Sequence, residues 1–535
     1  DGLMAVYDLK GQMRAGWPQH MDETFFRDTD PDHLKDEGFF GAPVLYDLDG
    51  DQKLEIIGAG MDAMVYVWHA DGKNMAGWPV IVRDPLEDEI AHIIVTPGVG
   101  DVDNDGLPEI VVGTNEVYGG NEGRAYLLKA TGASQPDKIE EALEPGWPIS
   151  LNGVAVNVLP LVGRGCPVNP ALADLDGDGT LEMNIDSIGY FPTFWKANGE
   201  PLKREDADGN LADVDNTNFG KLSNSEDSPA FVLINSGTFA NLDHKNGVDF
   251  FKGSAGFNFA LSFAEGGKRA TFDHQVSGWD TETFRFLEGF PRIIEDWQFF
   301  MNPTAVDIDN DGFANLLNGS GGYLVHAWNY KGVEPPGWPK NTGGWIISAP
   351  TAGDFDGDGK WDVYSSTRNG WVFAWKATGA VSKKGIEWQT FAHDFHNTSN
   401  YEEPVAQYNK YPDEPATDGS DGVDAADSAD ASDSADGVES ADAVDAADAA
   451  DGADSTDGAD ATDAADATDG VADATDAADA TDSADAAAVP ADGTDSGCSE
   501  TPRSAGPRQL AGGLLALGVL LGLRAAGRKR RSDAR

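Results

Sequence analysis

The sequence predicts an all-β fold, a β-propeller of repeated sheets, and three observations support this prediction. An acidic loop pattern recurs five times within residues 1–401. Each loop is followed by short β-branched and aromatic runs bounded by Asp-Gly or Asn-Gly, which is typical of strands and hairpins. The intervals between loops leave room for about four strands each, and a ring of such sheets buries faces that one sheet alone leaves exposed.

The repeated loop reads Asp-x-Asp-x-Asp-Gly-x-x-Glu/Asp and begins four residues after a Pro. We number the loops in chain order and count loop positions from the first Asp. The side chains at positions 1, 3, 5 and 9 are Asp47, Asp49, Asp51 and Glu55 in loop 1; Asp101, Asp103, Asp105 and Glu109 in loop 2; Asp174, Asp176, Asp178 and Glu182 in loop 3; Asp307, Asp309, Asp311 and Asn315 in loop 5; and Asp354, Asp356, Asp358 and Asp362 in loop 6. Only loop 1 departs at position 6, where Gln52 replaces Gly.

The interval between loops 3 and 5 is about twice the others, and it contains an eroded copy, loop 4 (residues 241–249). Asn241 and Lys245 stand at its positions 1 and 5, with Asp243 and Asp249 at positions 3 and 9. We expect the Lys245 ammonium to take the place of an ion. The sequence therefore predicts no metal in loop 4.

Loops 1, 2, 3, 5 and 6 are candidate Ca²⁺ sites, because several carboxylates within nine residues repel one another unless a cation joins them. Ca²⁺ accepts roughly 6–8 oxygen ligands, and position 7 adds a backbone carbonyl to the side-chain oxygens. EF-hand and dockerin loops begin in the same way, but they need an acid at position 12 and flanking helices, which these segments lack. We expect about five structural Ca²⁺ ions that tie strands together and do no chemistry, with weaker binding at Asn315.

Seven unit endings, each an aromatic strand followed by a turn, accompany the six loops. We expect seven blades, the first lacking its front half, with N-terminal material preceding Asp1; six complete blades plus a shared one is the alternative. These units resemble the FG-GAP/VCBS repeats of bacterial surface proteins, which are related to the calcium-binding propeller blades of integrin α-subunits. The resemblance spans residues 1–401 and implies a calcium-binding β-propeller.

The formal net charge of −55 comes from 37 Lys and Arg against 92 Asp and Glu, which excludes a nucleic-acid binder that works by neutralising phosphates. Much of it lies in a tail: residues 412–502 contain 28 acids and no Lys or Arg. From Asp418 to Asp469 an acid falls at every third position among small residues. We expect residues 402–496 to form a disordered stalk that its own charge extends.

Residues 497–535 contain Cys498, an uncharged apolar run from Leu510 to Leu523, and a final basic cluster. We expect a transmembrane helix at 510–527, with the basic end cytoplasmic before processing and everything upstream outside. This order closely resembles the MYXO-CTERM sorting tail of myxobacterial surface proteins. The resemblance implies cleavage near Cys498 by a sorting protease in the membrane, and display on the cell surface. A plain C-terminal membrane anchor is the alternative.

We expect an exported, membrane-anchored protein of the outer cell surface that binds a glycan or protein ligand of the envelope or matrix, in adhesion or recognition. The alternatives are a polysaccharide-degrading lyase or hydrolase on the propeller, or the accessory half of a larger secreted enzyme. We identify no group of residues in the sequence that would mark a catalytic site. His393 and His396 follow the last unit, and we expect them in a closing strand or a capped turn rather than in a metal pair.

Overall fold

The computed structural model describes residues 2–22, 38–82, 92–116, 123–151, 164–187, 192–205, 211–213, 231–245, 247–255, 274–283, 285–405 and 410–413. All of them lie within Asp1–Asp418, which belongs to one compact unit. The expected stalk beyond residue 413, Cys498 and the expected helix at 510–527 lie outside the described residues. Among the residues that the structure describes, no helix is long and apolar enough to cross a membrane.

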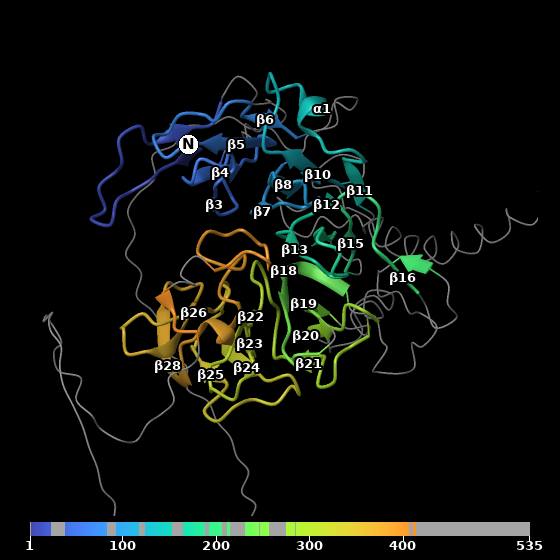
Figure 1. Cartoon of the computed structure of the whole chain (residues 1–535). Helices are drawn as coiled ribbons and strands as arrows, with labels where there is room; N and C mark the ends of the chain where they lie inside the picture. The colour runs from blue at the N-terminus through green and yellow to red at the C-terminus, as the bar shows by residue number, and fades with distance from the viewer. Residues whose placement is uncertain are drawn as a thin grey trace, which may run out of the picture. The chain divides into compact units, whose positions relative to one another are not determined.

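The fold is all-β, as predicted, and the described part of the chain forms six antiparallel meanders in sequence order (Figure 1). We call them sheets 1–6. Their strands are β3 (Val44–Tyr46), β4 (Glu55–Ala59), β5 (Met64–Trp68) and β6 (Val80–Ile81) in sheet 1; β7 (Gly98–Gly100), β8 (Glu109–Gly113), β10 (Gly123–Lys129) and β11 (Ile149–Leu151) in sheet 2; β13 (Ala171–Ala173), β14 (Glu182–Asn184) and β15 (Phe194–Trp195) in sheet 3; β18 (Phe231–Ala240), β19 (Asp249–Ala255), β20 (His274–Trp279) and β21 (Arg292–Ile293) in sheet 4; β22 (Thr304–Val306), β23 (Asn315–Gly319), β24 (Leu324–Trp328) and β25 (Lys340–Asn341) in sheet 5; and β26 (Thr351–Gly353), β27 (Lys360–Ser366) and β28 (Val372–Ala380) in sheet 6.

Smaller elements accompany these sheets. The pair β1 (Leu3–Met4) and β2 (Gln19–His20) precedes sheet 1, and its Trp17 packs edge-on against Trp68 with ring centres 6.0 Å apart. The other short elements are β9 (Asn115–Glu116) paired with β12 (Arg164–Gly165), β16 (Lys203–Glu205) paired with β17 (Leu211–Asp213), α1 (Ile139–Ala142) and the 3₁₀-turn η4 (Lys383–Gly385). Six meanders and one leading pair agree with seven unit endings, and the count of seven blades stays a prediction.

Neighbouring sheets pack against each other through their apolar faces. Sheets 1 and 2 share a core that contains Val44, Val65 and Tyr126, and sheets 5 and 6 share one that contains Leu317 and Trp361. The core common to sheets 3, 4 and 5 is rich in aromatic side chains, namely Phe194, Phe239, Phe250, Phe251, Trp279, Phe290, Trp328 and Trp388. Trp and Phe side chains therefore fill the space between these neighbouring sheets.

Paired glycines hold the turn of one sheet against the next. Gly77, in the Gly-Trp-Pro segment of sheet 1, contacts Gly132 in the turn after β10 of sheet 2. A Cβ on Gly77 would lie 2.0 Å from the Thr131 carbonyl oxygen, and the Gly77 φ of 92° also disfavours a side chain. The adjacent Trp78 indole donates a hydrogen bond of 2.9 Å to the Ala130 carbonyl. The same contact recurs at Gly16 with Gly72, Gly146 with Gly199, and Gly289 with Gly332.

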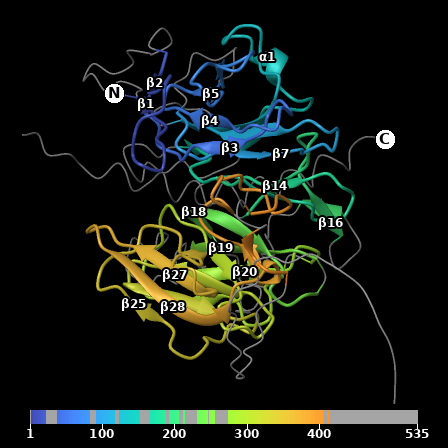
Figure 2. The same ribbon diagram turned by 60° about the vertical axis from the view of Figure 1, so that its left-hand side comes forward.

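The segment after β28 returns to the first strand of every sheet; we call residues 387–403 the closing segment (orange in Figures 1 and 2). It begins at the end of β29 (Ile386–Trp388), which pairs with β22 of sheet 5. The carboxylate of Glu387 accepts from the N–H of Asn241, just after β18 of sheet 4. Carbonyls further along accept from first-strand N–H groups: Gln389 from Ala352 of β26 at 3.1 Å, His396 from Leu45 of β3 at 2.9 Å, Thr398 from Val99 of β7 at 3.0 Å, and Ser399 from Leu172 of β13 at 2.9 Å.

The two histidines singled out in the sequence lie in this closing segment, in a capped turn. The Oδ1 atom of Asp394 accepts hydrogen bonds from the backbone N–H groups of His396 and Thr398, both at 3.1 Å. Burial lowers the pKa of His393 to about 3, so this imidazole is neutral. The expectation of a capped turn is therefore confirmed.

Gly77→Ala tests the contact between sheets. We expect a loss of about 2–4 kcal/mol in unfolding free energy, because the methyl group meets backbone and the left-handed conformation adds strain. Gly370→Ala is the matched control, since Gly370 has a φ of 86° and nothing within 4 Å of its Cβ position; it should lose about 1 kcal/mol. Chemical unfolding of both variants measures the difference, and equal losses would contradict this account.

Candidate cation-binding loops

All six loops occupy the same place, between the first and second strand of a sheet. Position 1 is the residue directly after the first strand, and position 9 begins the second strand in loops 1–5. The acid at position 9 is buried: Glu55, Glu109 and Glu182 are 1%, 2% and 0% exposed. Both ends of each loop are therefore held by the strand ladder, and position 9 faces inward.

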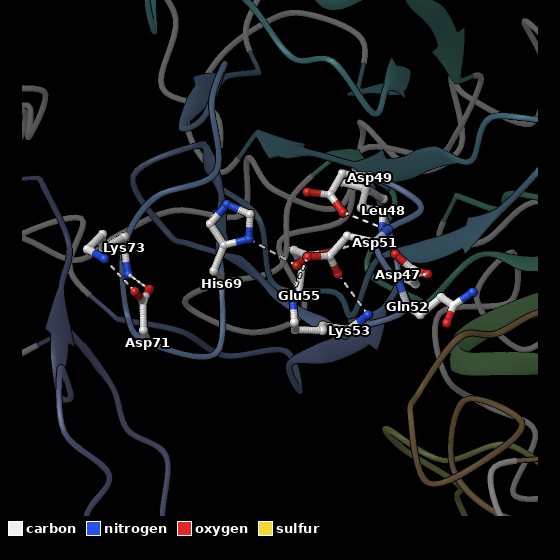
Figure 3. Close-up of polar contacts among 10 residues, drawn as sticks. All are labelled: Asp47, Leu48, Asp49, Asp51, Gln52, Lys53, Glu55, His69, Asp71 and Lys73. Carbon is white, nitrogen blue, oxygen red and sulfur yellow. Dashed lines mark hydrogen bonds and ion pairs between the residues drawn. The ribbon is translucent and has the colours of Figure 1, made fainter.

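The position-9 side chain holds the loop through its own backbone. In loop 1, Glu55 Oε2 accepts the N–H of Leu48 at position 2, at 3.0 Å (Figure 3). The same bond joins Glu109 to Val102 at 2.8 Å, Glu182 to Leu175 at 2.9 Å, Asn315 to Ile308 at 2.9 Å, and Asp362 to Phe355 at 3.1 Å. This hydrogen bond explains why position 9 needs a side-chain oxygen even apart from metal binding. The sequence alone did not reveal this second role.

The acid at position 1 closes the turn. Asp47 Oδ2 accepts the N–H of Gln52 at position 6, at 2.8 Å, and the corresponding bonds to Gly106, Gly179, Gly312 and Gly359 span 2.9–3.1 Å. Position 6 needs a left-handed backbone, which favours Gly. Gln52 adopts this conformation too, with a φ of 67°. Loop 1 thus has the same turn as the others despite its sequence departure.

The loops gather the carboxylates that the sequence singled out. In each of four loops, three side chains place one ligand atom apiece within 4.8 Å of one another. These groups are Asp47, Asp49 and Asp51 in loop 1; Asp101, Asp103 and Glu109 in loop 2; Asp174, Asp176 and Glu182 in loop 3; and Asp307, Asp309 and Asp311 in loop 5. Sets of oxygen donors of this kind suit a hard cation.

Burial and crowding raise the pKa values of several of these acids. Burial raises the pKa of Glu109 to about 8, and the charges of Asp103 and Glu144 add to it. Burial likewise raises the pKa of Asp309 to about 6, with further contributions from Asp311 and Asp307. Burial and neighbouring negative charges thus disfavour the charged form of these carboxyl groups.

In two loops, a lysine that follows the Trp of the third strand brings a positive charge to the acids. Lys196 follows β15, and its Nζ lies 2.9 Å from Asp176 and 3.2 Å from the buried Glu182 of loop 3. Lys376 holds the same place in β28, after Trp375, and its Nζ lies 2.5 Å from both Asp356 and Asp358 of loop 6. The pKa of Lys376 is raised by these two carboxylates. Sequence reasoning missed both lysines, although each follows the Trp of a repeated strand ending.

In other sheets, a different residue stands at the position that Lys196 and Lys376 occupy in sheets 3 and 6. In sheet 1 it is His69, whose Nδ1 lies 3.0 Å from Glu55 Oε1, so this carboxylate contacts both a backbone N–H and an imidazole (Figure 3). In sheet 2 it is Lys129, whose charge acts on Glu144. The loops therefore share one backbone geometry but differ in the charge placed beside them.

Loop 5 has an amide at position 9 in place of a carboxylate. The Asn315 Oδ1 atom accepts the Ile308 N–H, and the buried Nδ2 atom has no hydrogen-bond partner. The amide nitrogen of Asn315 does not bind cations. As a metal ligand, Asn315 would therefore have to coordinate the ion through Oδ1 while the same atom accepts the Ile308 N–H. Asp307, Asp309 and Asp311 are the main ligand candidates of this loop.

A histidine held by two acids lies away from the loops and was not foreseen. His326 of β24 is 3.1 Å from Glu295 through Nε2 and 2.6 Å from Glu334 through Nδ1, and it stacks on Trp328 with ring centres 4.9 Å apart. Its neighbours in sequence show no motif, because Glu295 lies in the preceding sheet connection. The arrangement fixes the ring between two carboxylates.

Comparison with known proteins identifies the repeats. The model of the FG-GAP-like repeat matches residues 47–112 and 307–365, which contain loops 1, 2, 5 and 6. A search of curated proteins finds no match. Similar solved structures include BamB from Moraxella catarrhalis (13% identity, 70% of this chain and 88% of that chain, TM-score 0.33) and the C-terminal domain of Pseudomonas aeruginosa PilY1 (13%, 72% and 78%, 0.35). The V. cholerae biofilm matrix protein Bap1 is a third (15%, 65% and 61%, 0.25).

Lys196→Met tests whether a lysine serves as the counterion of loop 3. We expect a loss of about 1–2 kcal/mol in EDTA, because the buried Glu182 is left without its partner. Lys73→Met is the matched control: Lys73 pairs with Asp71 at 2.5 Å but is 79% exposed, so its removal should change stability little. Urea unfolding of both variants decides, and a Lys196 variant as stable as the control would refute the counterion role.

The raised pKa of Glu109 predicts a pH dependence in EDTA. The pKa of Glu109 is about 8 in the folded protein and 4.5 ordinarily, so folding favours the protonated carboxyl group. This stabilisation is complete below pH 4.5 and is lost as the pH rises through about 8. The melting temperature should fall over this range, and less steeply in Glu109→Gln, which does not ionise. Glu140→Gln, at an exposed acid of α1, should keep the wild-type slope. Identical slopes in all three proteins would contradict the assignment.

Proposed function

We propose that residues 1–401 form a calcium-binding β-propeller of the cell surface that acts in adhesion or in recognition of envelope or matrix glycans or proteins. The observation that carries the proposal is the repeated loop geometry. Five loops combine an acid that closes the turn, an oxygen that anchors position 2, and further carboxylates between them. The match of loops 1, 2, 5 and 6 to the FG-GAP-like repeat supports the same conclusion.

The geometry favours a structural role for the ions. The acids at positions 1 and 9 already hold the backbone of the loop, so a cation among them would tie the end of a first strand to the start of a second. At a free Ca²⁺ of 100 times Kd, each site adds about 2.7 kcal/mol to stability. Affinities on the order of 10⁻⁴–10⁻³ M, as in extracellular modules, are sufficient only outside the cytoplasm. Sites in this affinity range would fill in the extracellular location that we propose.

The remaining parts of the proposal concern display and ligand. The acidic stalk would hold the propeller away from the surface, and the segment after Cys498 would deliver it there through a sorting protease or anchor it in the membrane. For a glycan ligand, exposed aromatic side chains are the natural contacts, because their faces stack on sugar rings. Sheet 6 exposes Trp371 and Phe355, at 66% and 46%.

Binding of the full chain to a glycan array, in Ca²⁺ and in EDTA, tests the function. We expect calcium-dependent binding that leaves the glycan chains intact, and a melting temperature that EDTA lowers by several degrees for each lost site. Shortened chains would replace the binding role with that of a polysaccharide-degrading enzyme. An unchanged melting temperature in EDTA would refute the calcium assignment, and an array without hits would turn the proposal toward a protein ligand.

A further inference from the structure

Loop 4 is the loop in which the sequence predicts an ammonium in place of an ion. It joins β18 to β19, the place that the other loops have in their sheets. The Lys245 ammonium, which we expected to take the place of an ion, lies at the rim of the loop. Its side chain is 64% exposed, and its Nζ is 3.0 Å from Asp243 Oδ2 and 6.0 Å from the centre of the Tyr330 ring. Lys245 therefore pairs with Asp243 from the exposed side of the loop.

Two oxygens inside loop 4 are buried without a hydrogen-bond partner. Asp249 at position 9 is 4% exposed, and its Oδ2 atom has no partner. The Oδ1 atom of Asn241 at position 1 is buried and also has none. A buried oxygen left in this state costs about 1–3 kcal/mol, and more when it is charged. Both atoms are at the positions that hold the loop acids elsewhere.

A small cavity opens beside Asp249. Asp243, Asp249 and Glu288 line it together with Lys245, Leu242 and Phe290. Its volume of about 20 Å³ accommodates a single ion or water molecule and excludes an organic ligand. Three carboxylates and one ammonium around so small a space leave an excess of negative charge.

Comparison among the loops shows what loop 4 lacks. In loops 3 and 6 the lysine that directly follows the Trp of the third strand supplies a positive charge, through Lys196 and Lys376. In sheet 4 the residue directly after β20 is Asp280. The chain thus adds a negative charge where two other loops add a positive one.

We propose that loop 4 is a further site for a small hard divalent cation, Ca²⁺, with Asn241 Oδ1, Asp243 and Asp249 as its side-chain ligands. These are all oxygen donors, and no nitrogen or sulfur ligand among the described cavity residues favours a transition metal. Lys245 sits on a long exposed stem, so it can release Asp243 when the ion enters. The inference rests on the proposed calcium binding and extends it to a loop outside both matched segments.

Counting bound ions in the full chain tests the proposal. Equilibrium dialysis with ⁴⁵Ca²⁺ should find one ion fewer in Asp249→Asn than in the wild-type protein. The melting temperature of this variant should be lower than wild type in Ca²⁺, but equal or higher in EDTA, where the amide replaces a carboxylate that burial disfavours. Asp71→Asn, at an exposed acid outside the loops, is the matched control and should keep the full count.

Lys245→Met provides a second measurement that does not depend on the folding of the first variant. Removing a positive charge beside the site should tighten the binding of one ion by about fivefold or more, since such a charge contributes at least about 1 kcal/mol at 4 Å. Wild-type protein without bound ions would refute the proposed calcium binding as a whole. Ions that bind equally in wild type, Asp249→Asn and Lys245→Met would overturn the loop 4 site alone.

Discussion

The hydrogen bonds between the closing segment and the first strands are the interaction on which the described fold depends. A buried backbone group without a partner costs about as much as a lost hydrogen bond. The strands β3, β7, β13 and β26 are three residues long, and each pairs with a second strand on one side only. Residues 387–403 provide partners on the other side. Sheets that lie hundreds of residues apart in the chain are thereby joined through one segment.

This arrangement fixes where the acidic loops lie. Each loop starts at the residue after a first strand, so positioning the first strands also positions the loops. The acids at positions 1 and 9 converge because they accept backbone N–H groups of their own loop. Convergence then creates repulsion, which the chain relieves by different means. Lys196 and Lys376 supply an ammonium, and Glu55 contacts His69.

The local patterns of the sequence were good predictors of local structure. Short β-branched and aromatic runs predicted the strands, and the regular loop pattern predicted the hairpin turns. The left-handed conformation of Gln52, where the pattern departs from Gly, was not foreseen. The lysines beside loops 3 and 6 were not foreseen, because they lie about 20 residues from the acids they contact and the pattern contains no sign of that contact. The role of Lys245 was inferred from its position alone, and the burial of Asp249 was not visible in the sequence.

By itself the sequence determined the all-β class, the number of acidic loops and the identity of their oxygen donors, because these follow from spacing within a single hairpin. The tertiary structure alone decided which loops have a positive charge of their own and which retain buried oxygens without partners. It also decided that residues 387–403 contact all six sheets. The physical reason is that charge compensation and backbone satisfaction depend on distance in space, and residues far apart in the chain, such as Ser399 and Leu172, meet only in the folded protein.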